Sequence, residues 1–250
     1  MADDPLADRR RRLTPGKFRD EIADIAAGLR ARIDAAVDAF PVDDKARADR
    51  RRRALDPVSG FEFFARTYFP HYLVKPASRV HEHLFERLPA IAAAEGGARD
   101  VIIAPRGAAK STLASLIYPM WRVFIGRSRY IIIAMDSYAQ AALQVEAIKA
   151  EFETNPRLAM DFPGECGQGR VWREGEIVTR TQARIEGVGS GMKLRGRRHG
   201  PHRPDLVILD DIENDENVQS PAQRDKTLRW IDRAVLKLGP ADGSLDCLIV

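Results

Sequence analysis

Apolar residues between Lys17 and Phe40 recur every three or four positions, which is the period of one face of a helix. The residues that form this stripe are Phe18, Ile22, Ile25, Leu29, Ile33 and Val37. Pro41 follows directly, and proline lacks the N–H group that a continuing helix needs. The pattern therefore predicts an amphipathic helix over residues 17–40 that packs through this stripe on the main body or on a partner.

A second helix is predicted after a segment that is rich in aromatic residues. These residues are frequent from 61 to 72, where we expect short helices. Ser78 then precedes a periodic apolar run, and serine is a favoured residue at a helix N-cap. We expect this helix to extend from about Arg79 to Ala94 and to end before the Gly96-Gly97 turn.

Strands and helices alternate from residue 100 onwards. Continuous apolar runs predict strands, and amphipathic segments between them predict helices. The predicted strands are 100–104, 129–135, 206–209 and 246–250, the predicted helices are 110–124, 137–153 and 221–238, and 176–181 with 183–187 predict a hairpin. Such alternation is typical of a mostly parallel central sheet flanked by helices on both faces. The predicted fold class is therefore α/β, with an N-terminal helical appendage.

The length and composition of the chain suggest how it divides into domains. Its 250 residues suit one α/β core with an appendage, and we divide them at 1–57 and 58–250. Residues 9–12 are four arginines, so we expect the first part of the appendage to be an unstructured basic arm. Cys166 and Cys247 are too few for a disulfide framework, and no apolar run reaches the roughly 18 residues of a membrane span. We therefore expect an intracellular protein.

Charge is unevenly distributed, although the formal net charge is only +4. Residues 170–203 contain nine Lys or Arg and three acids, whereas 205–216 is strongly acidic. A basic strip beside an acidic one is typical of a protein that handles polyphosphate, Mg²⁺ and nucleic acid. The alternative is a solvated charged surface without a partner.

Residues 104–112 have the composition of a loop that binds phosphate groups. The loop joins a predicted strand to a helix that starts at Lys110, and a helix N-terminus offers unpaired N–H groups and a positive dipole end. Lys110 is placed to reach the outer phosphates, and Ser111 is placed to hold Mg²⁺. We therefore predict that ATP or GTP binds through Pro105, Arg106, Gly107, Ala108, Ala109, Lys110, Ser111 and Thr112.

This loop departs from the pattern G-x-x-x-x-G-K-[ST], because Ala104 and Ala109 occupy both glycine positions. Alanine is well tolerated only where φ is negative, so we expect the left-handed turn of the loop at Gly107. Arg106 has two interpretations. It contacts the γ-phosphate or an acid of a second strand, or it is an exposed loop arginine.

The second strand is Leu206–Leu209, which two carboxylates, Asp210 and Asp211, follow directly in the form of a Walker B strand. Asp210 is predicted to hold Mg²⁺ opposite Ser111, and Asp211 is predicted to orient or deprotonate the attacking water, with Glu213 as its substitute. A helix N-cap or a solvated turn is the alternative for the two aspartates. Both motifs together predict a P-loop nucleoside triphosphatase of the RecA/ASCE type that uses ATP and Mg²⁺.

Four features together resemble the ATPase domain of the large terminase subunit, the DNA-packaging motor of tailed phages. They are the loop form Ala-Pro-Arg-Gly-x-Ala-Lys-Ser, the triplet Val80-His81-Glu82 ahead of it, the segment 191–196 followed by 203–211, and 220–224 followed by Trp230. The resemblance covers about residues 60–250. The combination is specific, although no single motif is.

The resemblance implies that ATP hydrolysis drives double-stranded DNA into a procapsid in the cytoplasm of a bacterial host. The implied partners are the portal protein, the small terminase subunit and further copies of this chain in a homo-oligomeric ring, without a membrane. The resemblance places His81 at the adenine side of the nucleotide, and it implies an arginine finger for the neighbouring subunit. Arg195 is the first candidate, followed by Arg197 or Arg198, and the alternative is that these residues and Arg203 form a DNA-facing patch.

Two parts of the family pattern do not occur in this sequence. The coupling motif would follow 248–250, where the sequence ends, and the acids of the C-terminal nuclease domain are absent. We therefore expect a truncated ATPase domain without nuclease activity. Two other functions remain open: a nucleotide-binding assembly module with little turnover, and a helicase-like P-loop ATPase, although the chain has no room for the second RecA-like domain of a helicase.

Overall fold

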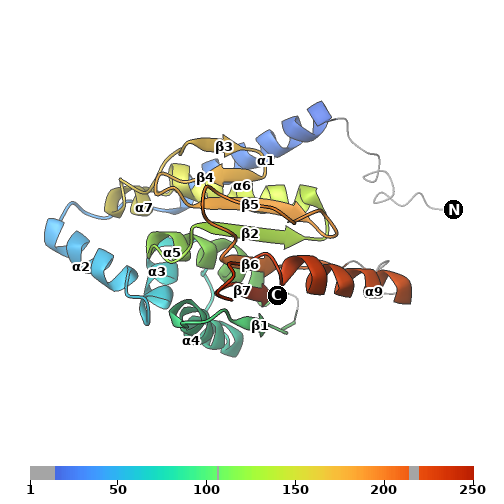
Figure 1. The fold of residues 1–250 in the computed structure, drawn as a ribbon. Helices are drawn as coiled ribbons and strands as arrows, with labels where there is room; N and C mark the ends of the chain where they lie inside the picture. The colour runs from blue at the N-terminus through green and yellow to red at the C-terminus, as the bar shows by residue number, and fades with distance from the viewer. Residues whose placement is uncertain (1–14, 106, 214–219) are drawn as a thin grey trace.

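Seven strands form one mostly parallel sheet in the order β1-β7-β6-β2-β5-β4-β3, as Figure 1 shows. This computed structural model describes residues 15–105, 107–213 and 220–250. The strands are β1 (Arg99–Val101), β2 (Tyr130–Met135), β3 (Val171–Arg173), β4 (Glu176–Val178), β5 (Arg184–Gly189), β6 (Leu206–Leu209) and β7 (Asp246–Ile249). Pairing is parallel from β1 through β7, β6 and β2 to β5, and antiparallel from β5 through β4 to β3. The predicted α/β class with a mostly parallel sheet is confirmed.

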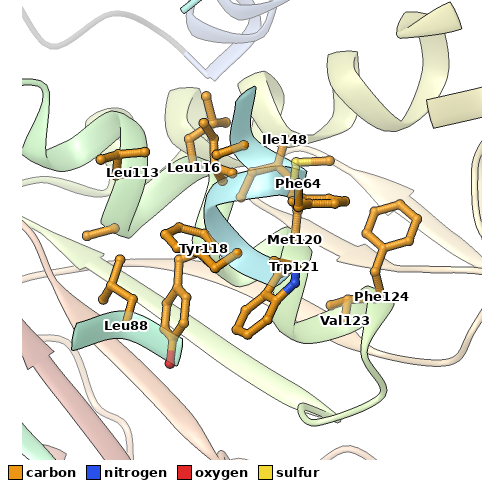
Figure 2. Packing of buried hydrophobic residues seen from close by; sticks show 14 of the residues in the cluster. Phe64, Leu88, Leu113, Leu116, Tyr118, Met120, Trp121, Val123, Phe124 and Ile148 are labelled. Atoms are coloured by element: carbon orange, nitrogen blue, oxygen red, sulfur yellow. The ribbon is translucent and has the colours of Figure 1, made fainter. Parts of the chain in front are cut away.

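Helices cover the sheet because its strands are apolar on both faces. Along β2, Ile131 and Ile133 point into one core, whereas Ile132 and Ala134 point into another. The larger core lies under α3, α4, α5 and α6, and Figure 2 shows part of this packing around Trp121. The helices are α1 (Pro15–Ala36), α2 (Asp44–Ala54), α3 (Gly60–Tyr68), α4 (Arg79–Ala93), η2 (Thr112–Ile117), α5 (Tyr118–Phe124), α6 (Tyr138–Thr154), α7 (Pro156–Asp161), α9 (Pro221–Trp230) and η3 (Ile231–Val235).

The N-terminal helix α1 packs along α6, as Figure 1 shows, so its apolar stripe is used within the chain. Two details of the prediction were wrong. Ile25 is 38% exposed, and Ala26 is buried in its place. The helix ends at Ala36, and Phe40 lies beyond it and packs edge-on against Tyr68, with ring centroids 6.0 Å apart.

Segment 44–54 folds as helix α2, which the hydrophobic pattern did not predict. Only Ala54 of this helix is buried, so its sequence carries no apolar period. Polar contacts hold it instead: Asp43 caps its N-terminus, and Arg50 binds the buried carboxylate of Asp161 through two hydrogen bonds of 2.7 and 2.8 Å. Trp121 also donates to the carbonyl of Ala54 at 2.9 Å.

The elements around the phosphate loop are close to those expected. Helix α4 begins after Ser78, and a continuous helix of α and π turns extends from Lys110 to Phe124. Strand β6 has the predicted bounds, whereas β1 is shorter than predicted. The structure also adds the short elements β3 and α7. Within 15–105, 107–213 and 220–250, no helix has the length and apolarity needed to cross a membrane.

Candidate nucleotide-binding site

A cleft of about 530 Å³ opens at the carboxyl ends of β1, β6 and β7. This is the edge at which open parallel sheets bind their ligands. The residues that line the cleft are Pro105, Gly107, Ala108, Ala109, Lys110, Ser111, Thr112, Asp210, Asp211 and Val250. The structure therefore brings the predicted phosphate loop and the two aspartates together. Arg106, which the sequence also assigned to this loop, lies outside the described residues.

The loop contains two residues in the left-handed region of backbone conformation. Gly107 has a φ of 80°, as expected. Ala109 has a φ of 52°, so the expectation that its φ stays negative was wrong. For an alanine this conformation costs about 1 to 2 kcal/mol, because Cβ crowds the following carbonyl oxygen. The loop closes between them, where Ala108 N–H donates to the carbonyl of Pro105 at 3.3 Å.

The helix that follows begins at Lys110 and points its N-terminus at the cleft. The first bond from this turn is made by Leu113 N–H to the carbonyl of Ala109, at 3.2 Å. Because the helix begins at Lys110, the N–H groups of Lys110, Ser111 and Thr112 have no acceptor one turn earlier within it and can donate to an anion. The Nζ atom of Lys110 donates to the carbonyl of Ala104 at 3.0 Å, which holds the side chain across the loop.

Ser111 and Asp210 join the two halves of the site. The Ser111 hydroxyl donates to Oδ1 of Asp210 at 3.0 Å, although the residues are 99 positions apart. Asp210 is only 2% exposed, and its buried Oδ2 atom has no hydrogen-bond partner among the residues that the structure describes. Burial raises the pKa of Asp210, while the hydroxyls of Ser115 and Ser111 act in the opposite direction. A buried carboxylate oxygen without a partner suits a cation ligand.

The two acids after Asp210 differ in position. Asp211 lines the cleft, is exposed, and has a φ of 48°, which is unusual for a residue other than glycine. Its carbonyl accepts from Asp136 N–H at 3.1 Å, so the turn after β6 is held to the end of β2. Glu213 is exposed and does not line the cleft.

His81 lies against the back of the phosphate loop. Its Nε2 atom is 3.0 Å from the carbonyl oxygen of Ala108, and its Nδ1 atom accepts from Ser78 N–H at 3.2 Å. Both ring nitrogens are thus engaged within the protein. His81 contacts the loop without lining the cleft.

The arginines proposed as a finger lie outside this cleft. A separate cavity of about 230 Å³ is lined by Arg195, Gly196, Arg197, Arg203, Arg233, Ala234, Lys237 and Leu238. Arg197 forms an ion pair with Glu186, whereas Arg195 is exposed. Arg198 is exposed too, and its backbone carbonyl accepts from Arg184 at 3.0 Å. Arg195 and Arg203 therefore share a basic cavity with Arg233 and Lys237, and no acid of the described segments lines it.

Sequence reasoning missed Ser115, which is fully buried beside this site. Its hydroxyl lies near enough to Asp210 to lower the pKa of that carboxyl, although it makes no hydrogen bond of normal geometry with a described residue. The available signal was its spacing, because a residue four positions after Ser111 shares a helix face with it. The π-helical turn of η2 lies over this stretch.

Comparisons with known proteins do not assign this chain to a family. No protein-family model matches this chain, and no curated protein matches it significantly.

Proposed function

We propose that this chain binds ATP with Mg²⁺ and hydrolyses it, as the ATPase motor domain of a large terminase subunit that translocates double-stranded DNA into a procapsid. The observation that carries the nucleotide part of this proposal is the hydrogen bond between Ser111 and Asp210. It joins the predicted phosphate loop to the predicted Walker B strand, beside Lys110 in one cleft. A chance strand–loop–helix junction has no reason to contain this pair.

The strand order supports the RecA/ASCE type of P-loop fold. In that type, one strand separates the P-loop strand from the Walker B strand. Here β7 lies between β1, which precedes the loop, and β6, which precedes Asp210.

The residues of the cleft suit the binding of a triphosphate. The N–H groups at the start of the helix donate to phosphate oxygens, and Lys110 moves from the Ala104 carbonyl to the outer phosphates. Asp211 would orient the attacking water and accept its proton, and its exposed position in the lining of the cleft supports this role. Glu213 would need a change of conformation to take this role.

Ser111 and Asp210 are the residues that would hold Mg²⁺. Their donors are a hydroxyl and a carboxylate oxygen, which match the preference of this ion for oxygen ligands. No cluster of three or more His, Cys, Asp or Glu that could hold a metal occurs in the described part of the chain. That suits an ion held by one carboxylate and the phosphates of its nucleotide. When bound, Mg²⁺ neutralises charge on the phosphates.

The basic cavity supports a nucleic-acid partner. The basic residues around it are all exposed: Arg195, Arg203, Arg233 and Lys237. This arrangement favours the binding of consecutive phosphate groups of a nucleic acid. Arg195 lies outside the cleft, so a role as an arginine finger requires a neighbouring copy of this chain, as in the ring that the terminase resemblance implies. The portal protein, the small terminase subunit and the bacterial cytoplasm belong to the same proposal.

Phosphate release measured at rising protein concentration, with and without duplex DNA, tests this function. A motor predicts turnover that rises with concentration and is stimulated by DNA. The double variant Arg233→Glu/Lys237→Glu should lose the stimulation, whereas Lys45→Glu/Lys75→Glu, which makes the same charge change at exposed lysines elsewhere, should keep it. ATP binding without turnover would support the assembly module instead, and turnover that DNA never stimulates would contradict the motor.

A further inference from the structure

His81 connects the start of helix α4 with the phosphate loop. Within α4, its N–H donates to the Ser78 hydroxyl at 3.4 Å, and its Nδ1 atom accepts from the Ser78 N–H at 3.2 Å. Its Nε2 atom reaches out of the helix to the carbonyl oxygen of Ala108, at 3.0 Å. The imidazole is half-buried between the two elements. One side chain therefore joins a helix end to a loop 27 residues away.

These partners determine the protonation of the ring. Nδ1 accepts a hydrogen bond from a backbone N–H, so it carries a lone pair and no proton. Nε2 faces a carbonyl oxygen, which can only accept, so Nε2 carries the proton. The contact thus requires the neutral Nε2–H tautomer of His81.

The Ala108 carbonyl belongs to the peptide unit that continues into Ala109. In a trans peptide, the carbonyl and the following N–H point in opposite directions. Ala108 and Ala109 line the cleft and His81 does not, so the carbonyl points away from the cleft towards His81. The N–H of Ala109 then points into the cleft, where a phosphate oxygen would bind.

The same peptide unit leads directly into a residue with a strained backbone conformation. It lies between Gly107 and Ala109, which both have a positive φ, and Ala109 is the alanine that adopts this region at a cost. A hydrogen bond to the Ala108 carbonyl favours the strained arrangement over alternatives in which the peptide plane is turned.

We propose that His81 is a positioning residue for the phosphate loop: its Nε2–H holds the Ala108 carbonyl and so presents the Ala109 N–H to a nucleotide phosphate. The proposal rests on the nucleotide-binding function inferred above. It gives His81 a role on the phosphate side of the nucleotide through the loop backbone.

The test is a set of ATP affinities measured by calorimetry in the presence of Mg²⁺. His81→Ala should weaken binding about tenfold, the equivalent of one hydrogen bond. His81→Gln should recover part of the loss, because its amide N–H can donate to the same carbonyl. Ser78→Ala removes the cap hydroxyl but keeps the Ser78 N–H and the Ala108 contact, so it serves as the matched control with nearly unchanged affinity.

A double-mutant cycle separates positioning from a general effect on folding. Glycine adopts a positive φ without help, so in an Ala109→Gly background the loss from His81→Ala should shrink to less than about threefold. An equal loss in both backgrounds, or no loss in the single variant, would overturn the proposal.

The imidazole ¹⁵N chemical shifts of the nucleotide-free protein provide a readout that needs no ATP. They should show the neutral Nε2–H tautomer, and a proton on Nδ1 would overturn the contact. If wild type and Lys110→Ala both fail to bind ATP, the proposed function fails, and these shifts still decide whether His81 holds the loop.

Discussion

The left-handed conformation of Ala109 predicts that glycine at this position stabilises the protein. Alanine at a φ of 52° costs about 1 to 2 kcal/mol, whereas glycine adopts this region freely. Glycine also gains conformational entropy in the unfolded chain, which removes about 0.4 to 1 kcal/mol of that advantage. The middle of these ranges gives a net gain of about 0.8 kcal/mol for Ala109→Gly. For a chain of 250 residues this raises Tm by about 1 to 4 °C.

The preceding alanine provides the matched control. Ala108 is half-buried like Ala109, but its φ is not positive. Ala108→Gly therefore keeps the entropic penalty without relieving strain, and Tm should fall by about 1 to 3 °C. Differential scanning calorimetry of both variants and wild type measures the difference. Equal falls in Tm for the two variants would refute the strained conformation of Ala109 and the account of the loop built on it.

Two further predictions concern the aspartates after β6. Burial raises the pKa of Asp210 above its unfolded value, so the stability that its protonated form contributes is present at low pH and is lost as the pH rises through the folded pKa. Asp210→Asn should therefore raise Tm at pH 7 and weaken Mg²⁺-dependent ATP binding. The gain in Tm should vanish as the pH falls through the folded pKa of Asp210. A gain in Tm that does not change with acid would contradict this prediction. Asp211→Asn should lower the rate of ATP turnover at least about a hundredfold, whereas Glu213→Gln should keep most of the wild-type rate. A larger loss of rate in Glu213→Gln than in Asp211→Asn would assign the general base to Glu213.

The sheet was predictable because its strands are short apolar runs separated by amphipathic helices. Leu206–Leu209 shows this most clearly, since four apolar residues end at a pair of carboxylates and form β6 with the predicted bounds. The edge strand was less predictable. Val101 is 60% exposed and Ile103 is 92% exposed, so their apolar character did not indicate burial, and β1 ends at Val101.

Helix α2 was not predicted from the sequence, for a different reason. It is held by arginines that reach partners distant in the sequence, such as Asp161 and the ring of Phe162, and such contacts leave no period in the sequence. Only the cap Asp43 was a local signal.

At the candidate site, the sequence indicated which residues take part but not which contacts they make. The sequence indicated that Lys110, Ser111 and the two aspartates meet, because motif order and strand ends place them at one edge. It could not reveal that Ala109 adopts a positive φ, because alanine normally avoids that region. It also could not reveal that His81 supports the loop from behind or that Arg195 lies in another cavity, since both depend on packing between distant segments.

The loop before Lys110 is proposed to bind the phosphates of ATP, and calorimetric titration of ATP with Mg²⁺ into wild type and Lys110→Ala measures whether it does. Lys75→Ala, which removes the same group at an exposed position elsewhere, is the control. Wild type and the control should bind ATP alike, whereas Lys110→Ala should lose at least about tenfold in affinity because a charge-assisted contact with the phosphates is removed. Equal affinity of wild type and Lys110→Ala would contradict this proposal.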